Sequence, residues 1–141
     1  MPTAIVTTNA PRDQFSPSFL PSTVRLISDL LDKPFKGIAV ILRNDVAMDV
    51  YHAGDHVVWI RMIGVGDFAD DKRNDEYVSK ITQHVSEDTG IPCDLISVSL
   101  QDISPTQVGF VDGELALDRI RRRKVKKEEE EMRSSIIGPF L

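Results

Sequence analysis

The chain has 141 residues, of which 41% are hydrophobic and 28% charged, and this composition is typical of one folded domain with its own core. Its formal net charge of −5 argues against nucleic acid as a partner, because phosphate binding needs a basic face. The single cysteine, Cys93, excludes a disulfide within one chain and zinc sites of the Cys-x-x-Cys kind. We therefore expect neither a metal nor a cofactor.

The N-terminal residues contain no basic segment followed by an apolar run, as a secretory signal would. No apolar run approaches the ~20 residues that cross a bilayer. We therefore expect a cytoplasmic protein without a membrane span, and any export would follow a route independent of a signal peptide.

The first part of the chain predicts a strand, a helix and a second strand. Residues 3–8 are rich in β-branched side chains, as in a short strand. Pro34 ends the next segment, and residues 38–42 have the composition of a buried strand. Between them, apolar residues recur at helical spacing after Ser18, a plausible N-cap: Leu20, Val24, Ile27 and Leu31.

The same pattern recurs in the second part of the chain. Residues 57–63 predict a strand, and residues 64–67 (Gly-Val-Gly-Asp) predict a turn, since they are too short for a dinucleotide fingerprint. Asn74 is expected to cap a helix that ends at Gly90. Residues 96–100 predict the next strand.

The two parts form a weak internal repeat. Pro34 and Pro92 are 58 residues apart, and so are Ile38 and Ile96. In each unit the helical crossover is long enough for the two strands to lie parallel. The predicted fold is α/β, with two β-α-β repeats forming a four-stranded mixed sheet and both helices on one face. Because the strand at residues 38–42 is apolar on both sides, the uncovered face predicts packing between subunits.

Residues 112–141 are predicted to be a charged extension of a domain formed by residues 1–111. Residues 108–111 favour a short additional strand, and residues 114–133 favour a helix. In that helix a basic block precedes an acidic run, which is the unfavourable order for the helix dipole. We therefore expect a marginal helix that frays.

Five segments of the chain match a known family: Met1–Arg12, Lys33-Pro34, Ile38-Ala39-Val40, Ile63-Gly64 and Val108-Gly109-Phe110. Through these segments, residues 2–111 resemble the macrophage migration inhibitory factor and D-dopachrome tautomerase family. The resemblance implies a trimeric barrel of three sheets, with sites between neighbouring subunits. It implies the keto–enol interconversion of small aromatic α-keto acids such as phenylpyruvate, or the isomerisation of dopachrome, and in some members cytokine-like binding to a cell-surface receptor.

The resemblance implies that Pro2 is the catalytic base, with its secondary amine free once Met1 is removed. Such a base must be neutral near pH 7, and burial and a nearby cation both lower the pKa of an amine. By resemblance, Lys33 holds the substrate carboxylate, and its charge would be that cation. The alternatives are a first-residue proline of purely structural role and a lysine that meets the dipole of a helix C-terminus.

The remaining site residues depart in part from the family. Ile63 matches a position whose backbone N–H contacts substrate. Ser97 and Ser99 stand where the family has an aromatic and an amide residue, and their spacing puts them on one sheet face. Phe110 replaces a tryptophan and would keep an apolar wall. We therefore predict a retained base in a widened pocket: either a homotrimeric tautomerase, with low activity on classical substrates, or a cytokine-like trimer that binds a receptor or partner.

Overall fold

A computed structural model describes residues 2–50, 54–110 and 112–137, and the chain divides into two units, residues 1–102 and residues 103–141. Unit 1 holds a four-stranded sheet with two long helices, and unit 2 holds a third helix. None of the helices in the described ranges is long and apolar enough to cross a membrane.

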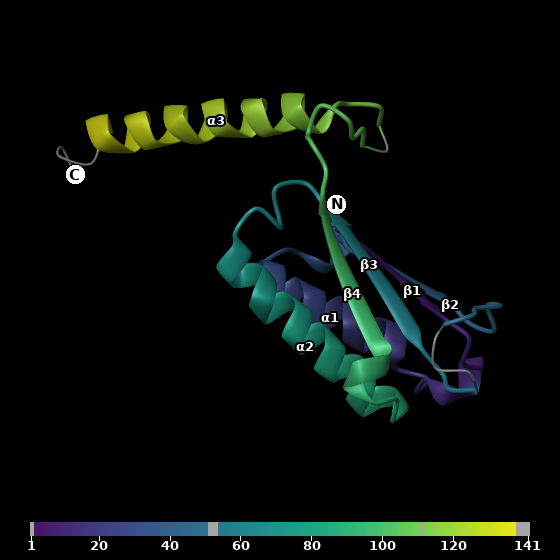
Figure 1. Cartoon of the computed structure of the whole chain (residues 1–141). Coiled ribbons are helices and arrows are strands. Elements are labelled where there is room, and N and C mark those ends of the chain that lie inside the picture. The colour runs from purple at the N-terminus through teal and green to yellow at the C-terminus, as the bar shows by residue number, and fades with distance from the viewer. Residues whose placement is uncertain (1, 51–53, 111, 138–141) are drawn as a thin grey trace. The chain divides into compact units, whose positions relative to one another are not determined.

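Two β-α-β repeats share one mixed sheet in unit 1 (Figure 1). Strand β1 (Thr3–Thr8) pairs in parallel with β2 (Ala39–Arg43), and β3 (Val58–Gly64) pairs in parallel with β4 (Ile96–Asp102). Strands β1 and β3 pair antiparallel in the centre, so the strand order is β2-β1-β3-β4. The predicted repeat and the mixed sheet are therefore confirmed.

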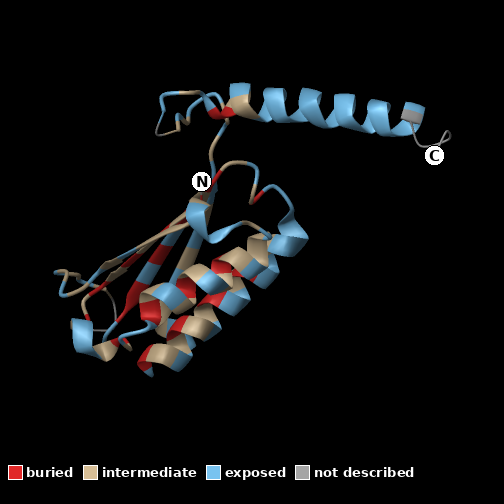
Figure 2. Ribbon diagram, turned by 180° about the vertical axis from the view of Figure 1, so that it is seen from behind, coloured by how far each residue is buried: buried red, intermediate tan, exposed pale blue. Residues whose placement is uncertain are grey.

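Helices α1 (Phe19–Leu31) and α2 (Asp71–Thr89) cover the same face of this sheet (Figure 1). Their buried residues face the strands, while the outer sides of both helices are exposed (Figure 2). Full burial of a valine, isoleucine, phenylalanine or methionine side chain contributes about 1.5–3 kcal/mol from removal of apolar surface from water. The core between helices and sheet includes Ala4, Val6, Phe19, Ile27, Val58, Ile60, Met62, Tyr77, Ile81 and Val85.

Helix α2 begins earlier than predicted. Its N-cap is Asp70, whose carboxylate accepts the backbone N–H of Lys72 at 3.0 Å. Asn74, the predicted cap, lies inside the helix and instead donates its side-chain amide to the Phe68 carbonyl at 2.8 Å. The prediction for Asn74 was wrong because an earlier aspartate satisfies the first free N–H groups. The predicted end at Gly90 is confirmed, with φ of 75° there.

Helix α1 has the predicted position but a different N-terminal arrangement. Ser18 occupies the N-cap position, yet its side chain makes no capping hydrogen bond. Its hydroxyl lies 3.3 Å from that of Ser16 instead. The helix ends at Leu31, and the C-cap residue that follows, Asp32, has a left-handed φ of 52°.

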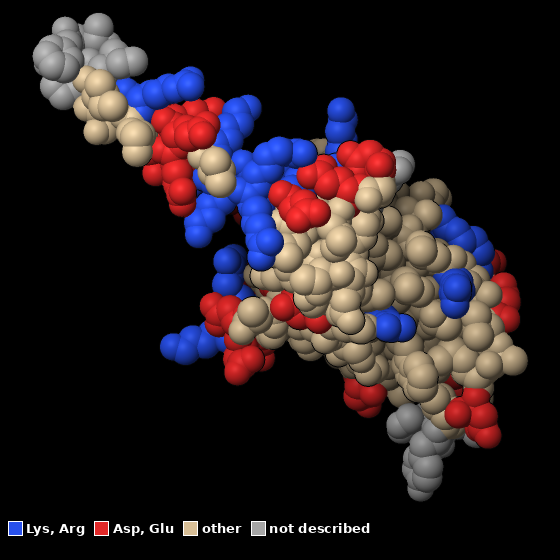
Figure 3. Space-filling view, turned by 90° about the horizontal axis from the view of Figure 1, so that it is seen from above, with Lys and Arg blue, Asp and Glu red and all other residues tan. Residues whose placement is uncertain are grey.

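Unit 2 differs from its prediction in two respects. Residues 108–110 form no strand, because only a single bridge joins Gly109 to Leu115; Val111 lies outside the described residues. Helix α3 (Ala116–Ile137) is longer than predicted and consists largely of good helix formers. Its side chains from residue 121 to residue 136 are exposed, and both signs of charge line it (Figure 3).

Candidate active site

Pro2 is enclosed at the start of the central strand. Its side chain is less than 2% exposed, and it lies on the helix-covered face with Ala4 and Val6. The Pro2 carbonyl accepts a hydrogen bond from the Ala39 N–H at 3.0 Å, which fixes the backbone against β2. An amine at this position would be largely removed from water, which disfavours its charged form.

Lys33 follows directly after α1 and already has a carboxylate partner. Its backbone N–H donates to the Ser28 carbonyl at 3.1 Å, so the chain is held to the helix end. The Lys33 Nζ lies 2.7 Å from Asp67 Oδ1, with side-chain exposures of 34% for the lysine and 6% for the aspartate. Asp67 was not among the site residues predicted from the sequence. The cation expected beside Pro2 is therefore paired within its own chain.

The loop that carries Asp67 is held on both sides. Before it, Gly66 adopts a left-handed φ of 73° and its N–H donates to Asp102 Oδ1 at 2.7 Å. After it, Phe68 is buried and meets the ring of Tyr77 edge-on, with centroids 6.0 Å apart. The turn predicted at residues 64–67 is thus present, and it fixes Asp67 in place.

The Asp67 carboxylate lies over Gly64, at the end of β3. A Cβ atom on Gly64 would overlap Asp67 Oδ2, so only glycine leaves room for this carboxylate. Thr3 pairs with Ile63 in the antiparallel register, and extending that register by one residue places Pro2 opposite Gly64. Opposite residues of an antiparallel pair have Cα atoms about 4.5–5.5 Å apart. We infer from this register that Asp67 lies near Pro2.

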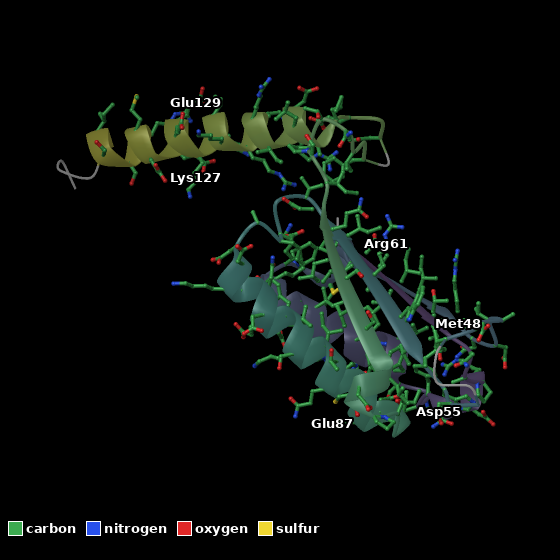
Figure 4. All side chains as sticks on the ribbon, in the orientation of Figure 1. Met48, Asp55, Arg61, Glu87, Lys127 and Glu129 are labelled. Carbon is green, nitrogen blue, oxygen red and sulfur yellow. The ribbon has the colours of Figure 1, made fainter. Side chains whose placement is uncertain are left out.

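The other predicted polar residues lie on the opposite face of the sheet. Ser97 and Ser99 are exposed and pair with Trp59 and Arg61 of β3, on the face that α1 and α2 leave open. Arg61, labelled in Figure 4, projects from this open face. Ile63 directs its side chain to the same face, in register with Thr3. Within one chain, the structure therefore does not bring the serines together with Pro2.

The open face contains a hollow of about 520 Å³. Strand pairs on this face alternate with the buried pairs of the helix-covered face, as the pleat of a sheet requires. Two arginines and a tryptophan give the hollow a mixed cationic and aromatic character. Its lining includes Ile5, Thr7, Arg43, Trp59, Ser97 and Ser99.

Phe110 belongs to unit 2, and one face of its ring is covered by a cation. The Arg119 guanidinium carbon lies 3.8 Å from the ring centroid. Arg119 is held in turn by Asp112 at 2.7 Å and by Glu114 at 3.2 Å. A hydrogen bond from the Glu114 backbone lowers the pKa of Asp112, and the positive charge of Arg119 adds to that effect. The apolar wall predicted at Phe110 is therefore partly a cation–π contact.

The family model described as macrophage migration inhibitory factor (MIF) matches residues 1–116. The chain belongs to the MIF family. Similar proteins include the MIF homolog of Trichuris trichiura, 26% identical over 110 residues that cover 78% of this chain and 96% of the relative. The MIF of Xenopus tropicalis is 24% identical over 110 residues, covering 78% and 95%. The family predicted from the sequence is thus confirmed.

Solved MIF structures show the same fold. The MIF of Trichinella spiralis matches with a TM-score of 0.75 at 21% identity, covering 80% of this chain and 98% of its own. The MIF homologue of Prochlorococcus marinus matches with a TM-score of 0.71 at 22% identity, covering 80% and 97%. The predicted α/β architecture is therefore confirmed.

In this MIF-family chain, Lys33 and Asp67 form an ion pair beside the end of β3, where the extended register places Pro2 on the neighbouring strand. Within the described ranges, no group of three or more His, Cys, Asp or Glu side chains could hold a metal ion. A lysine ammonium can bind an anion, and a free secondary amine at Pro2 would be able to accept a proton.

Proposed function

We propose that this MIF-family protein is a keto–enol tautomerase in which the amine of Pro2, freed by removal of Met1, is the catalytic base. The proposed substrate is a small aromatic α-keto acid or a dopachrome-like compound. The observation that carries the proposal is the burial of Pro2 at the start of the central strand, less than 2% exposed, in a chain of this family. Burial favours the neutral amine that proton abstraction needs.

In the proposed reaction, the Pro2 amine takes a proton from the carbon beside the substrate carbonyl. The carbonyl oxygen gains negative charge, and the backbone N–H of Ile63 is the proposed donor toward the substrate. The Pro2 ammonium then donates this proton to the enolate oxygen, which gives the enol and regenerates the neutral amine. The step isomerises the substrate and needs no cofactor.

We propose that the active form is a homotrimer. The open sheet face exposes large apolar side chains, with Ile41 at 43% and Trp59 at 56% exposure. Covering such residues favours association. In a trimer, Ser97, Ser99 and Phe110 of one subunit would serve the Pro2 site of a neighbour. Sedimentation velocity at several protein concentrations tests the proposal, and a monomer at all of them would contradict it.

The test of the function is an assay of enol formation with phenylpyruvate and with dopachrome, using protein whose N-terminus has been established by mass spectrometry. Replacing Pro2 by Gly keeps a free N-terminal amine but loses the secondary amine and its ring. Retention of Met1 would convert the Pro2 nitrogen into an amide and remove the base. Equal rates for the trimmed wild-type protein and Pro2→Gly, or no turnover by either of them, would refute the enzymatic proposal.

A second candidate function is cytokine-like binding of a receptor or partner by a trimer with little catalysis. Two observations favour it: the ion pair that occupies Lys33, and the exposed charged helix α3. Partner binding that survives Pro2→Gly but not removal of residues 112–141 would support this function. We further propose a cytoplasmic location.

A further inference from the structure

We propose that Asp67 is a specificity-determining residue, whose carboxylate occupies from within the chain the place beside Pro2 and Lys33 that a substrate carboxylate would take. The protein would then prefer aromatic keto–enol substrates whose acid group is masked, such as esters, over the free acids. This inference rests on the proposed function, and names the substrate class of the same site.

The ion pair is the first argument. A substrate carboxylate is proposed to bind Lys33, and Asp67 Oδ1 already lies 2.7 Å from its Nζ. The aspartate side chain is only 6% exposed, so water screens its charge poorly. A second carboxylate arriving at Lys33 would meet a like charge within a few ångströms. Since one ammonium cannot offset two neighbouring carboxylates, binding of a free acid is disfavoured.

The second argument is the free oxygen of Asp67. Its Oδ2 atom is buried and has no hydrogen-bond partner among the residues that the structure describes. This oxygen lies over Gly64, where the register places Pro2 on the neighbouring strand. A buried acceptor without a donor costs about 1–3 kcal/mol. A hydroxyl of the substrate enol would supply the missing donor.

The third argument is that the carboxylate cannot easily move away. Gly66 is tied to Asp102 at 2.7 Å on one side, and Phe68 is buried in the core on the other. Glycine at position 64 leaves the space that Asp67 Oδ2 fills. These restraints hold the backbone of the loop, and rotation of the Asp67 side chain alone would break its pair with Lys33. A free acid could therefore reach Lys33 only by breaking the existing ion pair or by approaching a second carboxylate.

The experiment compares phenylpyruvate with its methyl ester, using the trimmed wild-type chain and Asp67→Asn. Asparagine is close in size to aspartate but leaves the Lys33 ammonium unneutralised. We expect Asp67→Asn to raise kcat/KM for phenylpyruvate relative to the ester by on the order of tenfold or more. Asp67→Glu retains the negative charge, and we expect it to keep the wild-type preference for the ester. Asp71→Asn is the matched control, because it removes one exposed charge from the start of α2 and leaves the pair intact.

Binding separates this inference from the proposed function. Titration of phenylpyruvate against ¹⁵N-labelled protein reports affinity at Lys33 and Gly64 even without turnover. Tighter binding to Asp67→Asn than to wild type would support the inference, even if neither protein is catalytic. Equal affinity and an unchanged acid-to-ester ratio in Asp67→Asn would overturn it, while leaving catalysis by Pro2 untouched. If circular dichroism shows that Asp67→Asn does not fold, Asp67→Ser takes its place in the experiment. Tighter binding of phenylpyruvate to Asp67→Ser than to wild type would again support the inference, and equal affinity would overturn it.

Discussion

The Lys33–Asp67 pair makes an asymmetric prediction for folding stability. Replacing Lys33 by Met keeps an unbranched stem but leaves a carboxylate that is 6% exposed without a counter-ion. Removing one partner of a fully buried pair costs about 3–5 kcal/mol. Because the lysine side chain is 34% exposed, water reaches the pair and screens part of that loss. We expect Lys33→Met to lower the free energy of unfolding by about 2 kcal/mol.

The double variant decides whether this reasoning holds. Asp67→Asn leaves a cation that can reach water, so we expect it to cost about 1 kcal/mol or less. Adding Asp67→Asn to Lys33→Met removes the unpaired buried charge, so the double variant should be more stable than Lys33→Met alone. Urea denaturation followed by circular dichroism measures all four proteins at one protein concentration, because association shifts apparent stability. Additive losses in the double variant would refute a direct interaction between the two side chains.

Three further predictions concern the fold around the site. Thr8→Val should lower the free energy of unfolding by about 1–3 kcal/mol, measured by urea denaturation. The buried Thr8 hydroxyl donates to the Val57 carbonyl at 2.7 Å and accepts the Ala10 N–H at 3.0 Å, and valine can do neither. An unchanged denaturation midpoint would contradict this prediction. Burial lowers the pKa of His84 below 6.5, and the neighbouring acids offset this shift only in part. The contribution of His84 to folding stability is therefore present above pH 6.5 and is lost as the pH falls through the lowered pKa. His84→Gln should flatten that dependence, and an identical loss of stability on acidification in both proteins would speak against it. Removing residues 121–141 should change the free energy of unfolding of unit 1 by less than about 0.5 kcal/mol, because the described side chains from 121 to 136 are exposed. A larger loss of stability in differential scanning calorimetry would contradict this prediction.

The sequence predicts the sheet well because its signals are local. Short β-branched runs and the 58-residue spacing of Ile38 and Ile96 are enough to place all four strands to within two residues or so. Capping is predicted less well, since Asp70 and Asn74 are both acceptable caps and only the folded loop shows which N–H groups need one. A single bridge at Gly109 replaces the predicted strand, because alternation over so few residues does not require pairing.

The candidate site divides in the same way. Pro2 and Lys33 are detectable from short motifs, and so is the shared face of Ser97 and Ser99. Asp67 is not, because an acidic residue in a glycine-rich turn has the sequence pattern of a solvated loop. Its burial and its contact with Lys33 depend on the approach of two segments that are 34 residues apart in the chain. Long-range contacts of this kind are not encoded in periodicity.

The open sheet face also gives the protein a built-in fluorescent reporter. Trp59 is the one tryptophan in the sequence, and it is 56% exposed on that face. Indole emission moves to shorter wavelength when water is excluded, so dilution of unlabelled protein would display assembly as a spectral shift. Because Trp59 pairs with Ser97 across β3 and β4, the same emission would respond to an aromatic ligand entering the hollow. One spectrum would therefore follow association and occupancy without any added dye.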